Sequence, residues 1–252
     1  MAGEHTAEID RESLRTELCN WLRLLEISGT EDILLMEDWS QSEGKAGSGG
    51  EPPPGEPPLA ALEAETASCT RCGLHCTRTN MVFGEGNPSS RLMFVGEGPG
   101  RDEDLSGRPF VGRAGVLLTK IIEAMGLERD DVYITNIVKC RPPGNRNPEL
   151  DEISECLPCL EKQIEMIHPE IICTLGVVAT QTITGTRRGI GATRGRIHVY
   201  KGINVIPTFH PAACLRFPAN KKLVWEDIKE VMRFLDLPIR GAMRNGPGKN
   251  KH

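Results

Sequence analysis

Four cysteines in the chain have a spacing that is typical of a metal or cluster site. Cys69 and Cys72 form a C-x2-C pair, and Cys140 and Cys156 follow far downstream with fifteen residues between them. A two-residue gap lets a tight turn direct two thiolates to one centre, and thiolates bind both zinc and iron–sulfur clusters. Buried cysteines without any ligand role are the third interpretation. Spacing alone leaves all three open.

The compartment in which the protein is expected to act helps to decide between ligand and non-ligand roles for these cysteines. The chain has nine cysteines, an odd number, so at least one stands outside any intramolecular disulfide. Its acidic, polar beginning does not resemble a signal peptide, and no apolar run is long enough to cross a bilayer. We therefore expect a cytoplasmic protein without a membrane partner, whose reduced thiols favour metal or cluster ligation. Cys76 and Cys159 each lie within one helical turn of a proposed ligand, whereas packing roles are expected for Cys19, Cys173 and Cys214.

A glycine-rich turn forms a second candidate site. The segment GEGPG (residues 96–100) places Glu97 among glycines, and an acidic run that includes Glu103 follows it. Glycines allow backbone N–H groups to approach a ligand closely, although this spacing does not match a dinucleotide fingerprint. Further on, Phe110 stands between a proline and a glycine. Its ring is either part of the core or a platform on which a base stacks.

Two further polar residues follow apolar runs. Asn136 lies inside the apolar segment YITNIV, so its amide must bond either to a neighbouring loop or to a ligand. His210 precedes a proline in the segment TFHP (residues 208–211), and a single histidine there is more often structural than catalytic. Each motif taken alone favours a structural role.

Short apolar runs alternate with helical patterns between residues 90 and 236, which predicts an α/β protein with a mostly parallel sheet covered on both faces. In such sheets ligands bind at the carboxyl ends of the strands, and every motif above follows one of these runs. The expected strands are residues 91–96, 132–138, 170–175 and 204–208, and the expected helices are residues 113–125, 148–167, 177–184 and 222–235.

The remaining parts of the chain differ in composition. We expect an acidic extension over residues 1–39 with an amphipathic helix over 9–27, a flexible Gly/Ser/Pro-rich linker over 40–59, a compact domain over 60–238, and a disordered basic tail over 239–252. Residues 1–68 contain 15 acidic and 4 basic residues, a net charge of −11, which leaves 20 acidic and 26 basic residues, a net charge of +6, for the rest. A basic body can attract a phosphate backbone.

The motifs in their order resemble the family 4 uracil-DNA glycosylases. The resemblance rests on GEGPGRDEDLSGRPFVGRAG, YITNIVKCRPPGNRNP and HPAACLR, together with CTRCGLHCTRT and KLVWED, and covers about residues 68–235. It implies a three-layer α/β/α sandwich with a central, mostly parallel four-stranded sheet. It also implies an enzyme that flips uracil out of DNA and hydrolyses its N-glycosidic bond, leaving an abasic site for base excision repair.

The resemblance further implies a 4Fe–4S cluster and assigns four cysteines to it. These ligands are Cys69, Cys72, Cys140 and Cys156. Because glycosidic hydrolysis needs no electron transfer, the implied role is structural or DNA-positioning.

Three residues implied by the resemblance act on the departing base and sugar. Negative charge grows on uracil as the bond breaks through an oxocarbenium-like state, so donors aimed at that charge accelerate the reaction. His210 and the Gly98 N–H would face the uracil O2. Glu97 would hold the attacking water or stabilise the sugar cation.

Three further residues would recognise the base. Asn136 would bond to uracil N3–H and O4 and refuse cytosine, whose donor pattern is reversed at that edge. Phe110 would stack on the flipped base. Glu103 would crowd the C5 position and exclude thymine.

The resemblance also implies contacts with uracil-containing DNA, single- or double-stranded. Leu215 and Arg216 would wedge into the vacated stack, and Arg146 would bind phosphates from a loop near the cluster. We expect a monomer associated with the nucleoid, with a possible repair or replication partner binding through the N-terminal extension.

Three alternatives remain. A relative that traps uracil covalently would carry a basic insert ending in His after the second strand, where this chain reads CRPPGNRNP, and the similar RGRIH segment (residues 194–198) lies elsewhere. A glycosylase of the same fold with broader base preference is the second. The third is a non-catalytic iron–sulfur DNA-binding module associated with replication or repair, which would need none of Glu97, Asn136 and His210.

Overall fold

The computed structural model describes residues 58–239. The expectations for the acidic extension, for residues 40–57 of the linker and for the tail beyond residue 239 therefore lie outside the described residues. The first described element is the helix α2 (Pro58–Ala67), which begins close to the expected start of the compact domain. It contacts the long helix α5 (Leu150–Ile167).

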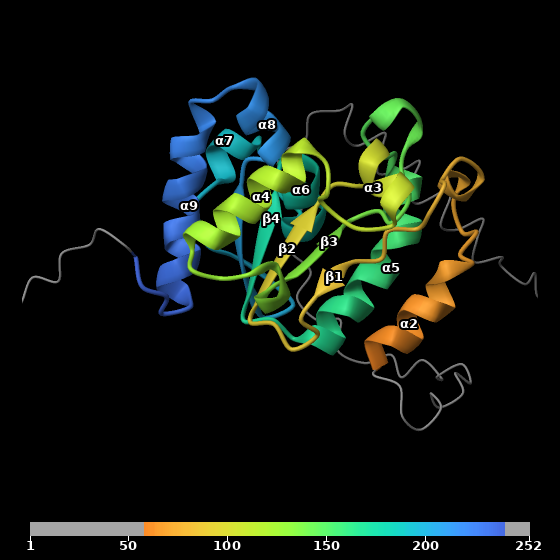
Figure 1. Ribbon diagram of the computed structural model, residues 1–252, viewed down its shortest axis with the longest axis horizontal. Helices are drawn as coiled ribbons and strands as arrows, with labels where there is room; N and C mark the ends of the chain where they lie inside the picture. Colours follow the sequence, from red (N-terminus) through yellow and green to blue (C-terminus); the bar gives the residue numbers. More distant parts are fainter. Residues whose placement is uncertain (1–57, 240–252) are drawn as a thin grey trace, which may run out of the picture. The chain divides into compact units, whose positions relative to one another are not determined.

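A six-stranded sheet with the order β1-β3-β2-β4-β6-β5 forms the centre of this region (Figure 1). Its four inner strands are parallel. They are β2 (Leu92–Gly96), β3 (Tyr133–Asn136), β4 (Ile171–Leu175) and β6 (Ile203–Thr208). Every residue of β2, β3 and β4 is buried, which explains their unbroken apolar sequences, because parallel strands are covered on both faces.

The predicted strand number was wrong, although the α/β class and the mostly parallel sheet are confirmed. Two short strands, β1 (Glu85–Gly86) and β5 (His198–Tyr200), pair antiparallel at the two edges. They have two and three residues, too few for an alternating pattern to be recognised in the sequence.

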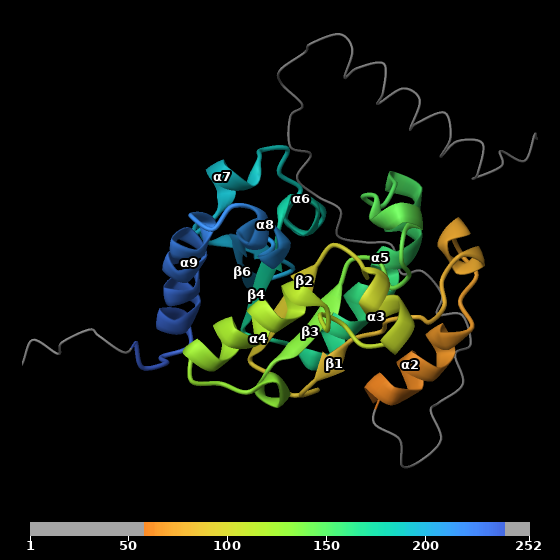
Figure 2. The same cartoon turned by 45° about the horizontal axis from the view of Figure 1, so that its top comes forward.

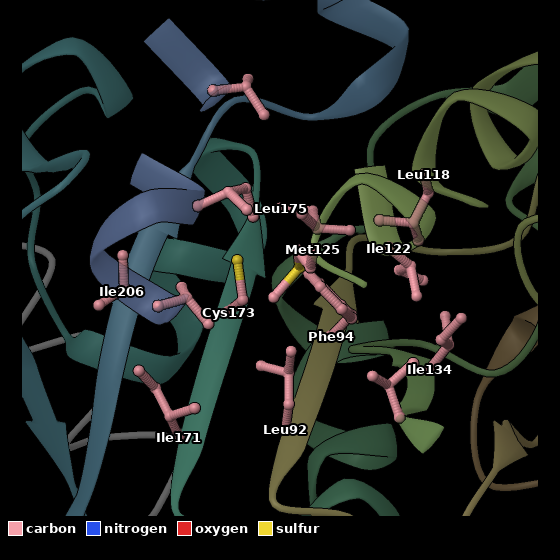
Figure 3. Packing of buried hydrophobic residues seen from close by; sticks show 14 of the residues in the cluster. Leu92, Phe94, Leu118, Ile122, Met125, Ile134, Ile171, Cys173, Leu175 and Ile206 are labelled. Carbon is pink, nitrogen blue, oxygen red and sulfur yellow. The ribbon is translucent and has the colours of Figure 1, made fainter. Parts of the chain in front are cut away.

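Helices cover both faces of the sheet, as the expected three-layer sandwich requires. Side chains of β2 alternate between the faces: Leu92 and Phe94 pack with helices α4 and α9, and Met93 and Val95 pack with α5 and α6. Figure 3 shows the first of these clusters, in which Leu118 and Ile122 of α4 approach the strands. The bounds of these helices are α4 (Arg113–Ala124), α6 (Val177–Thr184) and α9 (Asn220–Phe234).

Several short elements that the sequence did not predict connect the strands to the helices. They are α3 (Arg101–Ser106), α7 (Ile190–Thr193) and α8 (Pro211–Arg216), with 3-10 turns at Gly73–Cys76, Arg129–Asp131 and Pro143–Asn145. The helices α3, α6 and α8 follow the carboxyl ends of β2, β4 and β6 and lie along the same edge of the sheet (Figures 1 and 2). Among residues 58–239, no helix is long and apolar enough to span a membrane.

Candidate active site and cysteine cavity

A pocket of about 550 Å³ opens at the carboxyl ends of the four parallel strands. We call it the strand-end pocket. Eight of the residues predicted for the site line it: Glu97, Gly98, Glu103, Phe110, Asn136, Arg146, His210 and Arg216. The loops after β2, β3 and β6 supply them, so the parallel sheet brings together motifs that are more than one hundred residues apart in the chain. Leu215 is not among the lining residues.

Asn136 ends strand β3 and carries an unsatisfied acceptor. Its side chain is buried, and among the described residues its Oδ1 is the one buried side-chain oxygen or nitrogen without a hydrogen-bond partner. An unpaired buried amide oxygen costs about 1–3 kcal/mol, so such atoms mark places where a ligand supplies the partner. The ligand predicted by this geometry has a hydrogen-bond donor at this point.

The ring of Phe110 forms one wall of the pocket beside His210. The two ring centroids are 5.5 Å apart, with an angle of 32° between the planes. Phe110 has a φ of 52°, a left-handed conformation that costs about 1–3 kcal/mol for such a residue and is typical of functional sites. Two glycines make room for it: a Cβ at Gly96 would lie 2.5 Å from the ring Cζ, and a Cβ at Gly115 would lie 1.8 Å from the carbonyl oxygen of Phe110.

Arg129 holds this strained segment from behind. Its guanidinium donates to the carbonyl oxygens of Pro109 at 2.9 Å and Phe110 at 3.2 Å, and it pairs with Glu85 at 3.3 Å. Arg129 is far from the glycine-rich motifs in the sequence, and nothing in its own segment indicated this role.

His210 lies at the end of β6 with a defined tautomer. Its Nδ1 accepts a hydrogen bond from the backbone N–H of Ala212 at 3.1 Å, so the ring proton of the neutral form is on Nε2. Burial, reinforced by the positive charge of Arg216, lowers the pKa of His210 to about 4. At neutral pH the residue is therefore an uncharged imidazole with one N–H to donate.

Glu97 and Gly98 form the opposite side of the pocket. Burial raises the pKa of the Glu97 carboxyl above its ordinary value, and no hydrogen bond within residues 58–239 engages that carboxyl. A Cβ at Gly98 would lie 2.7 Å from Cγ2 of Val138, so the local packing requires glycine. The Gly98 backbone can thus approach a ligand that a side chain would hold away.

Glu103 is engaged by the protein backbone. Its Oε1 accepts hydrogen bonds from the N–H groups of Val111 at 3.0 Å and Gly112 at 2.9 Å, and its Oε2 accepts from Gly100 at 3.2 Å. The carboxylate therefore joins the glycine-rich turn to the Phe110 segment. Exclusion of thymine by this residue stays a prediction, and the contacts describe a residue that positions loops.

The predicted DNA-binding residues have different environments. The Arg146 guanidinium forms two short hydrogen bonds with Glu152, at 2.8 and 2.6 Å, and lies 3.3 Å from Glu149. Its charge is thus offset by carboxylates, which weakens the prediction that it binds phosphate. Leu215 and Arg216 are exposed on α8, with 37% of Leu215 accessible.

A second cavity, the cysteine cavity, lies beside α5 and encloses about 360 Å³. All four predicted ligands, Cys69, Cys72, Cys140 and Cys156, line it, with Cys159 as a fifth cysteine. Among residues 58–239, no three His, Cys, Asp or Glu side chains converge closely enough to hold a single metal ion. Thiolates are ligands that both iron–sulfur clusters and zinc accept.

Cations surround these thiols. Arg78 donates to the sulfur of Cys140 at 3.1 Å, and Arg71 forms a hydrogen bond with Cys69. Burial raises the pKa of the Cys69 thiol, but the hydrogen bonds from Arg71 and the charges of both arginines outweigh it and hold that pKa below its ordinary value. The Glu155 carboxyl is the one acidic group in the lining, and it is exposed.

Lys139 gives the clearest sign of what the cysteine cavity accepts. This lysine is 2% exposed, and its ammonium donates to Thr135 Oγ1 at 2.6 Å, Asn136 O at 2.8 Å and Gln163 Oε1 at 2.6 Å. All three partners are neutral, and no carboxylate pairs with Lys139 among the described residues. Because a buried charge is retained where an opposite charge faces it, an anionic thiolate-bound group fits this cavity.

The remaining cysteines differ in burial and in the groups that they contact. Cys173 and Cys214 are buried in the apolar core, which confirms their predicted packing role. Cys159 is buried against Leu62 and Phe83, and Cys76 is exposed with its sulfur 3.3 Å from Nε2 of His75. Cys19 lies outside the described residues.

Comparisons with known proteins agree on one family. Residues 83–229 match the model of the uracil DNA glycosylase superfamily. The chain is 49% identical over 191 residues to a type-4 uracil-DNA glycosylase of Sulfurisphaera tokodaii, covering 72% of this chain and 87% of that protein. It is 49% identical over 181 residues to a type-4 enzyme of Thermotoga maritima, covering 70% and 94%. A type-5 uracil-DNA glycosylase of Pyrobaculum aerophilum is 31% identical over 171 residues, covering 59% and 72%.

Proposed function

The chain belongs to the uracil DNA glycosylase superfamily and, within it, to the type-4 uracil-DNA glycosylases, and we propose that the strand-end pocket is where it excises uracil from DNA. The enzyme is a DNA-repair glycosylase that hydrolyses the bond between uracil and deoxyribose. The observation that carries the assignment of the pocket is the unpaired, buried Oδ1 of Asn136 beside the ring of Phe110.

Recognition of uracil follows from that unpaired oxygen. The N3–H of uracil donates to Asn136 Oδ1, and the amide NH2 of Asn136 donates to uracil O4. Cytosine presents an acceptor at N3 and a donor at N4, so the same amide would leave buried groups unpaired on both molecules. Sites built to hydrogen-bond one partner reject the mismatched one by about 10⁴- to 10⁵-fold.

Departure of the base is assisted by neutral donors. As the glycosidic bond breaks, negative charge collects on uracil O2, where the Nε2–H of His210 and the Gly98 N–H donate. A neutral imidazole is suited to this role because its single proton is directed away from Ala212 by the hydrogen bond at Nδ1. Glu97, whose carboxyl has no partner among the described residues, holds the attacking water or stabilises the sugar cation.

Cys69, Cys72, Cys140 and Cys156 would hold a 4Fe–4S cluster in the cysteine cavity. Through these thiolates the four cysteines would join the segment before β1, the loop after β3 and helix α5 around the cluster, which would supply a structural cross-link and no electron for the hydrolysis. The ammonium of Lys139 and the guanidinium groups of Arg71 and Arg78 offset its negative charge.

The setting of the enzyme is part of the same proposal. It acts as a monomer on uracil in single- or double-stranded DNA, in the cytoplasm and at the nucleoid, where thiol ligands stay reduced. The acidic N-terminal extension (residues 1–39) binds a repair or replication partner. Support for these points comes from the cysteine usage and the acidic composition of that segment.

Strand scission tests the function directly. The protein, purified without oxygen, is incubated with a labelled oligonucleotide carrying one uracil, and abasic sites are then cleaved with alkali. We expect scission at uracil and none with thymine or cytosine at the same position. Stable binding to the uracil oligonucleotide without scission, by a protein with its cluster intact, would contradict this proposal and favour the non-catalytic binding module.

A further inference from the structure

The corner between helices α8 and α9 exposes an aromatic ring that none of the functions above uses. Phe217 follows α8 directly, and 64% of the residue is accessible, against 37% for Leu215 two positions earlier. Leu215, Phe217, Pro218 and Ala219 are all exposed, so several apolar residues adjoin at this corner around Arg216. Adjoining exposed apolar residues, unlike single ones, can mark an interaction site.

The backbone of the corner is held by its own hydrogen bonds. The N–H of Phe217 donates to the carbonyl oxygen of Ala213 at 2.8 Å, and its carbonyl oxygen accepts from the N–H of Asn220 at 3.0 Å. The N–H of Lys221 donates to Pro218 O at 3.1 Å. The ring is thus presented on an ordered backbone, which reduces the entropic cost of stacking on a ligand.

Positive charge without a partner surrounds the ring. Arg216, Lys221 and Lys222 are exposed, and none of them forms a hydrogen bond or an ion pair with the described residues. No acidic residue occurs between residues 211 and 225. Arg146, on another loop of the strand-end pocket, is instead paired with Glu152. The α8–α9 corner therefore presents three cations that are free to bind phosphate.

The corner is continuous with the strand-end pocket. Ala212, Ala213 and Arg216 of α8 line the pocket, and His210 precedes the helix directly. Phe217 is the next residue after Arg216. A nucleotide strand that delivers a flipped uridine to the pocket must therefore pass this corner with its neighbouring nucleotides.

We propose that Phe217 stacks on a base next to the flipped uridine on the same strand, while Arg216, Lys221 and Lys222 bind the adjacent phosphates. An aromatic ring flanked by cations matches this ligand, because every base has a π-face and every nucleotide a phosphate. The inference rests on uracil excision by the strand-end pocket. It adds a stacking contact at Phe217 to the wedge that the resemblance implies for Leu215 and Arg216.

Binding of an uncleavable substrate tests the proposal. The probe is a fluorescein-labelled single-stranded oligonucleotide of fifteen nucleotides with one 2′-fluoro-2′-deoxyuridine, whose fluorine destabilises the sugar cation. We expect Phe217→Ala to weaken binding about tenfold or more, since base–aromatic stacking is worth about 1–3 kcal/mol. Phe217→Tyr, which keeps the ring, should remain within about twofold. Val199→Ala is the matched control: Val199 is equally exposed, at 64%, but lies on β5 and does not line the pocket.

Two further measurements locate the contact. With 2-aminopurine placed on either side of the uridine, the fluorescence of one of the two complexes should differ between the native chain and Phe217→Ala. Inhibition by free uracil should be the same in both, because Phe217 does not line the pocket. Lys221→Ala with Lys222→Ala should lower the slope of log affinity against log salt by about 1.4, and Phe217→Ala should leave that slope unchanged.

The outcomes separate this inference from the proposed function. If the native chain excises uracil but Phe217→Ala binds the probe as tightly and gives the same 2-aminopurine signals, the stacking role is wrong and the glycosylase assignment stands. If the native chain excises no uracil, the proposed function fails first. Equal losses in Phe217→Ala and Phe217→Tyr would also overturn the inference, because they would show that the ring face is not what binds.

Discussion

The strand-end pocket and the cysteine cavity differ in the kind of partner that their surroundings lack. In the strand-end pocket, the unpaired group is a neutral acceptor, Asn136 Oδ1, so the ligand must bring a hydrogen-bond donor. In the cysteine cavity, Lys139, Arg71 and Arg78 stand beside the thiols, and no carboxylate among residues 58–239 pairs with Lys139, so a negatively charged group would complement them. The protein does not itself provide a hydrogen-bond donor for Asn136 Oδ1 or a carboxylate for Lys139. The chemical type of each ligand can be inferred from that missing group.

The two regions are nevertheless joined. Asn136 and Lys139 are three residues apart at the end of β3, and the Lys139 ammonium donates to the Asn136 carbonyl oxygen. On the other side, Glu103 binds the Phe110 segment, while its neighbour Asp104 accepts from the N–H of Thr79 at 2.8 Å, next to Arg78 at the cysteine cavity. To test the two regions separately, substitutions must therefore remove a side chain that acts in only one of them.

The largest effect should come from removing the unpaired acceptor. Asn136→Ala deletes both hydrogen bonds that read uracil, and we expect kcat/KM for a uracil oligonucleotide to fall about a thousandfold. The free energy of unfolding should rise or stay unchanged, because the buried unpaired oxygen is removed with the side chain. Gel-based scission rates and urea unfolding measure the two quantities.

A matched change elsewhere controls for damage to the fold. Asn87→Ala removes a half-buried asparagine side chain whose Oδ1 already accepts a hydrogen bond from the N–H of Ser89 at 2.8 Å. Its kcat/KM should match that of the native chain. Uracil excision by Asn136→Ala within tenfold of the native rate would show that the strand-end pocket is not read through this amide.

The next largest effect concerns the cysteine cavity. Lys139→Met leaves Gln163 Oε1 and Asn136 O without the ammonium and removes positive charge beside the thiolates. We expect the free energy of unfolding to fall by about 2–4 kcal/mol and the cluster absorbance to decay faster in air. Lys162→Met is the control, because Lys162 is exposed on the same helix as Gln163 and lies 3.6 Å from Glu65.

Comparison with Lys162→Met also shows which result would contradict the prediction for Lys139→Met. Surface pairs of this kind contribute less than about 1 kcal/mol, so Lys162→Met should unfold like the native chain. If Lys139→Met unfolds like Lys162→Met and keeps its cluster equally long, the buried ammonium does not stabilise the cysteine cavity.

The sequence predicted the location of the site better than its internal contacts. Asn136 and His210 could be placed because apolar parallel strands precede them, and the carboxyl ends of such strands converge. The contacts of Lys139 with Gln163, 24 residues away, and of Arg129 with Phe110 depend on side-chain packing that no local pattern encodes. Arg146 illustrates the same limit, since its pairing with Glu152 depends on how α5 begins.

A smaller effect distinguishes two roles of Glu103. Its carboxylate accepts three backbone N–H groups, so Glu103→Ala should loosen the Phe110 segment and lower kcat/KM for uracil about tenfold, chiefly through a higher KM. Scission at thymine should stay at background. If Glu103→Ala instead cuts at thymine while uracil excision is unchanged, the carboxyl excludes the C5 methyl group and does not position the loop.

The last effect is a dependence of stability on pH that belongs to the strand-end pocket. The pKa of His210 is about 4 in the folded chain, against about 6.5 when unfolded, so between these values the unfolded chain binds a proton that the folded chain does not. The free energy of unfolding should therefore fall as pH falls from 6.5 towards 4, and the contribution of His210 should be fully present above pH 6.5. His210→Gln should make this part of the stability curve flatter in urea unfolding at pH 7, 5.5 and 4.5. Equal slopes in the two proteins would mean that folding does not lower the pKa of His210, and the burial-depressed pKa assigned to it here would then be wrong.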